Sequence, residues 1–305
     1  MNILLFVLIV VAFSYINPKA HAQQTEKSKA AYLKFKSNKY AESLLLVNEE
    51  LESGDTSTFV LYLRGQIFLQ MKKYNESLSD FNKCISFKKD IAVFHFFRGL
   101  CNYYLNNKQV AIEDFNQTLV LDNTMIEVYL NRGAAKYDSD DYKGAVEDFK
   151  KYMETYPEDA ACLNNLGSAE CKLGLDSIGL YHLDRSIVLS PTNAEYFNNR
   201  GEARYNLGNA VGAESDFTKV MELASWHAEA PFRRAKIRFE RKEYEPALID
   251  CTKAINNVKM YPEALVLRAK IKIEMKDVTG ACQDLQTANE QKAKDIETLL
   301  KAVCK

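Results

Sequence analysis

The sequence repeats itself with a period of 34 residues. A glycine or alanine recurs at this spacing eight times, as Ala31, Gly65, Gly99, Gly133, Gly167, Gly201, Ala235 and Ala269. A second small residue follows 12 positions after each of these, and an apolar residue usually follows 4 positions later. A fixed period of roughly 20–50 residues is typical of repeat architectures, in which each repeat packs mainly against its neighbours.

Each repeat is expected to form two helices. Turn residues such as Asn106-Asn107 and Asp138-Ser139-Asp140 separate the two small positions, with helical periodicity on both sides. Small side chains let two helices approach closely, and the apolar residue fills the space beside the crossing. We expect the repeats to start near residues 24, 58, 92, 126, 160, 194, 228 and 262.

The period, the two small positions and an aromatic residue after the turn (Tyr40, Tyr74, Tyr142 and Tyr244) together resemble the tetratricopeptide repeat family. The resemblance implies an all-α fold, a right-handed superhelical solenoid of about eight 34-residue helix-turn-helix repeats over residues 23–295. One departure concerns the aromatic residue that the family has three places after the glycine. Polar residues replace it here, namely Asn102, Lys136, Glu170, Arg204, Arg238 and Lys272.

The amino terminus is typical of an export signal. An apolar run of 14 residues, Ile3 to Ile16, is shorter than the roughly 20 residues of a membrane-spanning helix. Ala20-His21-Ala22 then supplies the small residues of a cleavage site. We therefore expect a signal peptide over residues 1–22, a mature chain that begins at Gln23, and a location in the periplasm or cell envelope. The alternative is an uncleaved membrane anchor.

The carboxyl-terminal residues 296–305 are expected to form a capping helix. Ile296, Leu299, Leu300 and Val303 follow the spacing of one helix face, which could cover the core of the last repeat. A helix that binds a partner is the alternative.

An arginine precedes the small residue in six repeats, and an aspartate stands 16 residues after each arginine. The pairs are Arg64 and Asp80, Arg98 and Asp114, Arg132 and Asp148, Arg200 and Asp216, Arg234 and Asp250, and Arg268 and Asp284. The other two repeats lack both, having Ala30 with Leu46 and Leu166 with His182. This joint presence predicts structural ion pairs, either within a repeat or between neighbours. A ligand-binding ladder of arginines is the alternative.

The family resemblance also indicates where a ligand would bind. In that family the first helices line a concave groove that holds peptide segments of other proteins. The corresponding places here hold Asn131, Asn164, Asn165, Asn198, Asn199, Arg233 and Lys236. We expect solvent-facing asparagines to bind a peptide backbone, and we expect the two cations, Arg233 and Lys236, to bind an acidic group. Tyr62, Leu63, Phe96 and Phe97 would make the amino-terminal end of the groove apolar.

Other functions have little support in the sequence. The net charge of −1 and the absence of a basic run argue against nucleic acid. Seven cysteines without CxxC spacing argue against a metal site, and most are expected to be small buried residues. The histidines look isolated, and no catalytic or phosphate-binding motif occurs, so we expect neither enzyme activity nor a cofactor. The favoured function is a scaffold or adaptor that binds another protein, and the alternative is a self-associating structural subunit.

Overall fold

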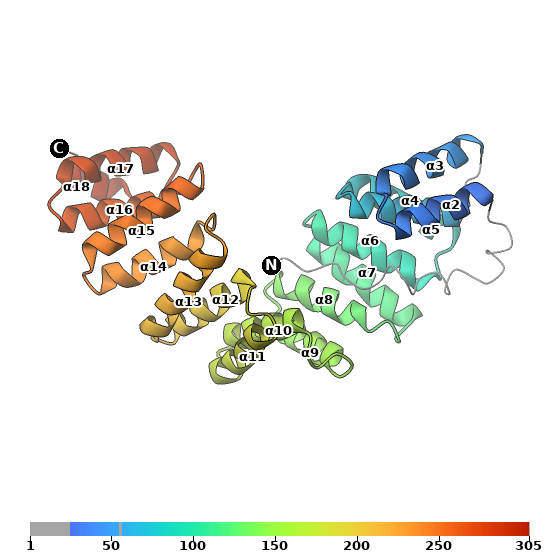
Figure 1. Cartoon of the computed structure of the whole chain (residues 1–305), viewed down its shortest axis with the longest axis horizontal. Coiled ribbons are helices and arrows are strands. Elements are labelled where there is room, and N and C mark those ends of the chain that lie inside the picture. The colour runs from blue at the N-terminus through green and yellow to red at the C-terminus, as the bar shows by residue number, and fades with distance from the viewer. Residues whose placement is uncertain (1–24, 55–56, 305) are drawn as a thin grey trace. The chain divides into compact units, whose positions relative to one another are not determined.

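The structure, a computed structural model, describes residues 25–54 and 57–304, and every regular element in these ranges is an α-helix (Figure 1). The first helices of the repeats are α2 (Glu26–Lys36), α4 (Thr58–Gln70), α6 (Ala92–Tyr104), α8 (Glu127–Tyr137), α10 (Ala160–Lys172), α12 (Ala194–Asn206), α14 (Glu229–Glu240) and α16 (Pro262–Glu274). The second helices are α3 (Tyr40–Glu52), α5 (Tyr74–Phe87), α7 (Lys108–Leu121), α9 (Tyr142–Met153), α11 (Asp176–Leu189), α13 (Ala210–Leu223), α15 (Tyr244–Asn257) and α17 (Val278–Glu290). A short helix, α18 (Glu297–Val303), follows them. The expected fold of helix-turn-helix repeats is confirmed.

The turn inside each repeat has one backbone conformation that recurs along the chain. One residue per turn has a positive φ of 57–77°, namely Asn38, Lys72, Asn106, Asp140, Gly174, Gly208, Lys242 and Lys276. The residue after it donates its N–H to a carbonyl at the end of the first helix, as Asp141 does to Lys136 at 2.9 Å. These left-handed residues end the first helix and let the chain reverse direction.

The two helices of a repeat fit together through residues of complementary size. A Cβ atom added to the first-helix glycine would lie within 3.0 Å of a phenylalanine on the second helix, in the pairs Gly65–Phe81, Gly99–Phe115, Gly133–Phe149 and Gly201–Phe217. Where the first helix has alanine, the second has a smaller residue, in the pairs Ala31–Val47, Ala235–Cys251 and Ala269–Leu285. The residues that recur every 34 positions are therefore those at which the two helices of each repeat cross.

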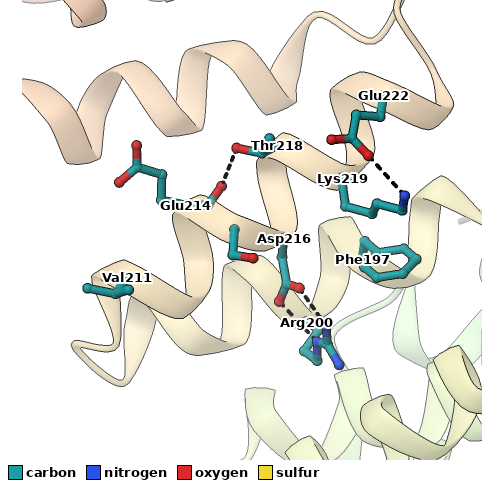
Figure 2. Close-up of a pocket in the computed structure, with 9 residues that line it drawn as sticks. Phe197, Arg200, Val211, Glu214, Asp216, Thr218, Lys219 and Glu222 are labelled. Carbon is teal, nitrogen blue, oxygen red and sulfur yellow. Dashed lines mark hydrogen bonds and ion pairs between the residues drawn. The ribbon is translucent and has the colours of Figure 1, made fainter.

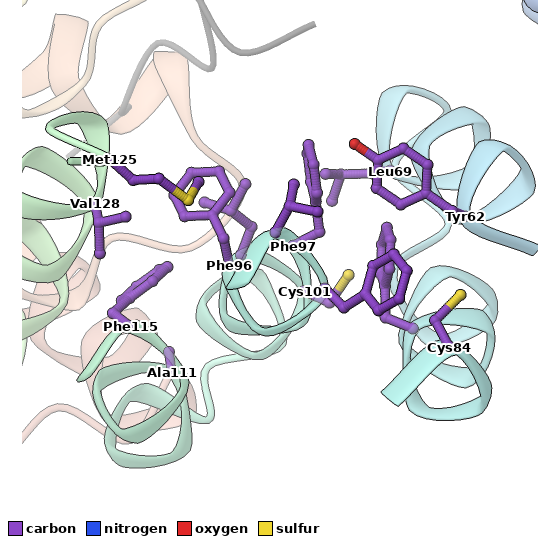
Figure 3. Packing of buried hydrophobic residues seen from close by; sticks show 14 of the residues in the cluster. Tyr62, Leu69, Cys84, Phe96, Phe97, Cys101, Ala111, Phe115, Met125 and Val128 are labelled. Atoms are coloured by element: carbon purple, nitrogen blue, oxygen red, sulfur yellow. The ribbon is translucent and has the colours of Figure 1, made fainter. Parts of the chain in front are cut away.

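The second to fourth repeats share an aromatic core (Figure 3). Tyr62 contacts Phe81 and Phe97, and the rings of Phe81 and Phe97 stack with their centroids 5.4 Å apart. The expectation that four apolar residues line the amino-terminal end of the groove is wrong, because all four are buried. Tyr62, Leu63, Phe96 and Phe97 are at most 5% exposed, so they belong to the core. They are buried because each packs against the neighbouring helices.

The helices form two compact units, which divide between Ala169 and Glu170. The boundary falls within α10, the first helix of the fifth repeat. The N-terminal unit contains the first four repeats and most of α10, and the C-terminal unit contains the end of α10, α11, the last three repeats and α18. Leu299, Leu300 and Val303 of α18 pack on Ala269, Ala281 and Leu285 of the last repeat.

No helix within residues 25–54 and 57–304 combines the length and the apolar character that crossing a membrane requires. The expected signal peptide over residues 1–22 and the new amino terminus at Gln23 lie outside the described residues.

Candidate functional site

The six arginine-aspartate pairs are formed within repeats. Each guanidinium binds its aspartate through Nε and Nη2, with N–O distances between 2.6 and 3.1 Å. The aspartates are at most 4% exposed, and the arginine side chains are 14–27% exposed. Because two parallel bonds fix the guanidinium, each pair holds the first helix of a repeat against its second helix.

The arginines also contact the preceding repeat. In each case Nη1 donates to a polar side chain 16 residues earlier, at distances of 2.7–3.4 Å. The acceptors are Asn48, Asn82, Asn116, Asp184, Thr218 and Thr252. One arginine side chain thus joins three helices: its ion pair with the aspartate lies within a repeat, and its Nη1 bond reaches the preceding repeat. The guanidiniums are occupied by the protein itself, which supports the structural interpretation.

The polar residues three places after the small residue also belong to these clusters. Asn102, Lys136, Arg204, Arg238 and Lys272 each place a second donor 2.8–3.0 Å from the same aspartate. In the sequence these residues stand out only as departures from the family pattern. Their spacing of 12 residues before the aspartate was the signal that could have identified them.

The fifth repeat exchanges the positions of the acidic and the basic residue in this arrangement. Glu170 occupies the place of the second donor, and His182 occupies the place of the aspartate. His182 Nδ1 lies 2.6 Å from Glu170 Oε2, and Glu170 is fully buried. The expectation that the histidines are isolated is therefore wrong here.

His95 is also in contact with charged and polar groups. Its Nε2 lies 2.8 Å from the carbonyl of Lys89, and its Nδ1 lies 4.0 Å from Asp114. Burial raises the pKa of Asp114, but the neighbouring His95 ring and the hydrogen bonds from Arg98 outweigh burial and hold that pKa below its ordinary value.

The asparagines of the N-terminal unit are less accessible than expected. Asn164 and Asn165 are 2% and 5% exposed, and Asn164 Nδ2 lies 3.3 Å from Asn165 Oδ1. Asn131 is half-buried and donates to the carbonyl of Glu127 at 2.9 Å, one turn earlier on α8. The expectation of solvent-facing amides is thus wrong for Asn164 and Asn165, because these side chains are enclosed.

The corresponding residues of the C-terminal unit form a half-exposed polar surface. Asn198 and Asn199 lie on α12, and Arg233 and Lys236 lie on α14. We call these four residues, with Glu202, the α12–α14 surface. Asn198 Oδ1 is shielded from solvent and has no hydrogen-bond partner within the described part of the chain. A buried acceptor without a partner is uncommon in proteins.

The two cations of this surface differ in their contacts. Arg233 donates to Glu229 at 2.8 Å, and its Nη2 lies 3.6 Å from Glu202. Lys236 is exposed, and its Nζ lies 5.2 Å from the centre of the Tyr205 ring. Arg233 is therefore held by carboxylates of the chain itself, whereas Lys236 can reach an acidic group on a partner.

A cavity of about 480 Å³ lies on α12 and α13 of the same unit (Figure 2). Its charged lining is already paired: Arg200 binds Asp216, Lys219 binds Glu222, and Glu214 binds Arg238 and Arg241. Thr218 accepts a hydrogen bond from Arg234. Because these groups serve contacts within the repeats, the cavity offers a ligand few binding groups.

The cysteines have one bond among them. Cys282 and Cys304 form a disulfide, whereas Cys84, Cys101, Cys162, Cys171 and Cys251 are free. Four of the five free cysteines are buried, in agreement with the expected role as small core residues. Among residues 25–54 and 57–304, no three His, Cys, Asp or Glu side chains gather in a group that could hold a metal ion.

Comparisons with known proteins agree with this architecture. Residues 60–91 match the family model of the tetratricopeptide repeat. No curated protein matches the chain significantly.

Several solved structures share the fold. A tetratricopeptide repeat protein from Parabacteroides merdae is 16% identical, with a TM-score of 0.63, over 80% of this chain and 98% of that one. A chain of the APC/C hetero-tetramer Cut9–Hcn1 is 15% identical, with a TM-score of 0.66, over 87% of this chain and 53% of that one. Pseudomonas aeruginosa pilF is 17% identical, with a TM-score of 0.60, over 70% of this chain and 97% of that one.

The 34-residue period, the paired helices and the match of residues 60–91 to the family model lead to one conclusion: the chain has the tetratricopeptide-repeat fold.

Proposed function

We propose that this protein is a non-enzymatic scaffold or adaptor that binds an extended segment of a partner protein. The first helices of its repeats would provide the binding surface. The observation that carries the proposal is the shielded Oδ1 of Asn198, which has no partner within the described residues. If the half-buried Asn198 amide turned outward, a backbone N–H of a bound peptide would satisfy this acceptor, because an extended peptide presents N–H groups along its length.

The neighbouring side chains suit the same kind of ligand. Contacts of Arg233 with Glu202 and of Lys236 with Tyr205 bring the exposed faces of α12 and α14 together. An extended segment could therefore cross from one first helix to the next. Exposed Lys236 would favour a segment that carries an acidic side chain near the residue bound by Asn198.

We also propose that the protein is exported to the periplasm or cell envelope. Two observations support this location. The apolar run of residues 3–16, followed by Ala20-His21-Ala22, has the pattern of a signal peptide. The Cys282–Cys304 disulfide belongs to a class of bond that persists mainly in oxidising compartments.

A crosslinking pull-down from the envelope fraction, followed by calorimetric titration with the captured partner, would test the scaffold proposal. Asn198→Ala should weaken binding by about 2- to 12-fold, the equivalent of one hydrogen bond of about 0.5–1.5 kcal/mol. Asn123→Ala, in an exposed loop of the N-terminal unit, is the matched control and should have no effect.

Two results would contradict the proposal. One is unchanged affinity of the Asn198→Ala protein when its helical content and melting temperature are preserved. The other is a captured species that proves to be a further copy of the same chain, which would favour the self-associating subunit instead. Light scattering of the purified protein distinguishes a monomer that gains mass only with a partner from a protein that assembles alone.

A further inference from the structure

The last helix of the described chain is short, and a disulfide bond ties the residue after it to the preceding helix. Helix α18 has seven residues, no side-chain hydrogen bond at its N-cap, and no fully buried residue. A helix this short is marginal in water unless tertiary contacts stabilise it. The disulfide joins Cys304, the residue after α18, to Cys282 in the first turns of α17, 22 residues earlier.

The bond lies where it can keep the core of the last repeat covered. Leu285 and Ala269 are fully buried, and Leu299, Leu300 and Val303 of α18 pack against them. In an earlier repeat the next first helix provides such cover, as Phe97 of α6 does for Phe81 of α5. The last repeat has no following repeat within the described residues, so α18 provides the cover.

Cys282 and Cys304, like Cys171, are more accessible than the buried Cys84, Cys101, Cys162 and Cys251. Both are half-buried, so a small thiol or disulfide reagent can reach them. Cys84, Cys101 and Cys251 are fully buried, and burial raises the pKa of each of these thiols to about 12. Burial also raises the pKa of Cys171 to about 11 and the pKa of Cys162 above its ordinary range. Because the thiolate is the reactive form, these five cysteines should react slowly.

We propose that Cys282 and Cys304 form a redox-sensitive clasp, which closes α18 over the last repeat when oxidised and releases it when reduced. Closing removes two electrons and two protons from the two thiols and forms the S–S bond. The disulfide of a thiol oxidoreductase, or oxidised glutathione, accepts them and becomes two thiols. In the reverse direction one thiol of a dithiol reductant attacks a sulfur of the bond, which releases the other cysteine and forms a mixed disulfide. The second thiol of the reductant then attacks the mixed disulfide, which releases the first cysteine and leaves the reductant as a disulfide. The exposed product is the apolar end formed by Ala269, Ala281 and Leu285.

Hydrogen exchange of the purified full-length chain, with and without a dithiol reductant, tests the clasp. Mass spectrometry after alkylation should count five free thiols in the denatured oxidised protein and seven after reduction, in line with one bonded pair and five free cysteines. Amides of residues 297–304 should exchange about tenfold faster or more after reduction, whereas those of α14 and α15 should not change.

Cys304→Ser should exchange rapidly in residues 297–304 under both conditions, and Cys171→Ser, the matched control, should behave like the unaltered protein. The reduced unaltered chain provides the same comparison if Cys304→Ser fails to fold. Seven free thiols in the oxidised protein, or equal protection of α18 in the oxidised and reduced proteins, would overturn the proposal.

Discussion

Arg132 holds Asp148 through two hydrogen bonds, from Nε at 2.8 Å and from Nη2 at 2.6 Å. Lys136, one turn further along α8, lies 2.9 Å from the same carboxylate. In the second repeat the equivalent Asp80 is held by Arg64, and Phe68 occupies the place of the lysine. The two repeats therefore differ in how many cations would remain beside the buried carboxylate after loss of the arginine.

This difference predicts unequal effects of the same substitution. Arg64→Ala should lower the free energy of unfolding by about 3 kcal/mol, because it leaves Asp80 buried without its cation. Arg132→Ala should cost only about 1–2 kcal/mol, because Lys136 still neutralises Asp148. Urea unfolding of both variants, with exposed Lys83→Ala as control, measures the difference. Equal losses would show that the second cation contributes nothing.

The third bond of the arginine predicts coupling between neighbouring repeats. Arg132 Nη1 donates to Asn116 of the preceding repeat at 2.7 Å. A double-mutant cycle with Arg132→Ala and Asn116→Ala should give an interaction energy of about 0.5–1.5 kcal/mol in the free energy of unfolding. Strict additivity of the two losses would indicate that the bond between repeats does not contribute to stability.

The size match at the helix crossing leads to a rescue experiment. Gly133→Ala would place a Cβ 2.8 Å from Phe149 Cε1, so we expect a loss of about 1–3 kcal/mol from overpacking. At an unobstructed helix position the same change would instead stabilise by about 0.5–1 kcal/mol. Adding Phe149→Leu should recover part of the loss, because Ala269 already faces Leu285 in the last repeat. Thermal unfolding of the single and double variants decides, and a Gly133→Ala protein as stable as the unaltered chain would exclude the clash.

The left-handed turn residues predict a stabilising substitution. Lys242 has a φ of 63°, whereas Gly208 has the same role in the preceding repeat with a φ of 77°. Lys242→Gly should raise the free energy of unfolding by up to about 1 kcal/mol. A left-handed lysine is strained by roughly 1–2 kcal/mol, and glycine removes this strain, but glycine also gives the unfolded chain more conformational entropy, which offsets part of the gain. Gly208→Ala, where the added Cβ meets open space, should be destabilising for the same backbone reason. Opposite signs in urea unfolding are the expected outcome.

The sequence predicted the fold well because the period is a consequence of local packing. Gly133 and Phe149 recur in register with their equivalents, and this register alone implies two crossing helices. The joint presence of Arg132 and Asp148, and their joint replacement by Leu166 and His182 in the next repeat, likewise predicted a contact that the structure contains.

The candidate site was harder to predict because exposure depends on neighbours that the period does not specify. Asn165 and Asn199 are equivalent in sequence, yet Asn165 is buried and Asn199 is half-buried. The role of Glu170 was also missed, since a carboxylate stands where other repeats have a donor and only the structure shows His182 beside it. Equivalent positions in a repeat thus share a backbone place but not an environment.

The start of α14 predicts a pH dependence of stability. His227 Nδ1 accepts the N–H of Ala230 at 3.0 Å, so the ring acts as a neutral cap for the first turn of the helix. Burial lowers the pKa of His227 below 6.5, although Glu229 and Glu195 oppose the shift. The unfolded chain therefore binds a proton more readily than the native protein does between the two pKa values. The contribution of His227 to stability is present above the unfolded pKa of about 6.5 and is lost as pH falls through the native value.

His227→Asn tests this directly, because the amide oxygen can accept the same N–H and does not titrate. The free energy of unfolding should fall less between pH 8 and pH 5 in the variant than in the unaltered protein, measured by urea unfolding at about half-unit intervals. His95 and His182 remain in both proteins, so the difference between the two curves isolates the contribution of His227. Superimposable curves would mean that His227 titrates alike in the folded and unfolded chains.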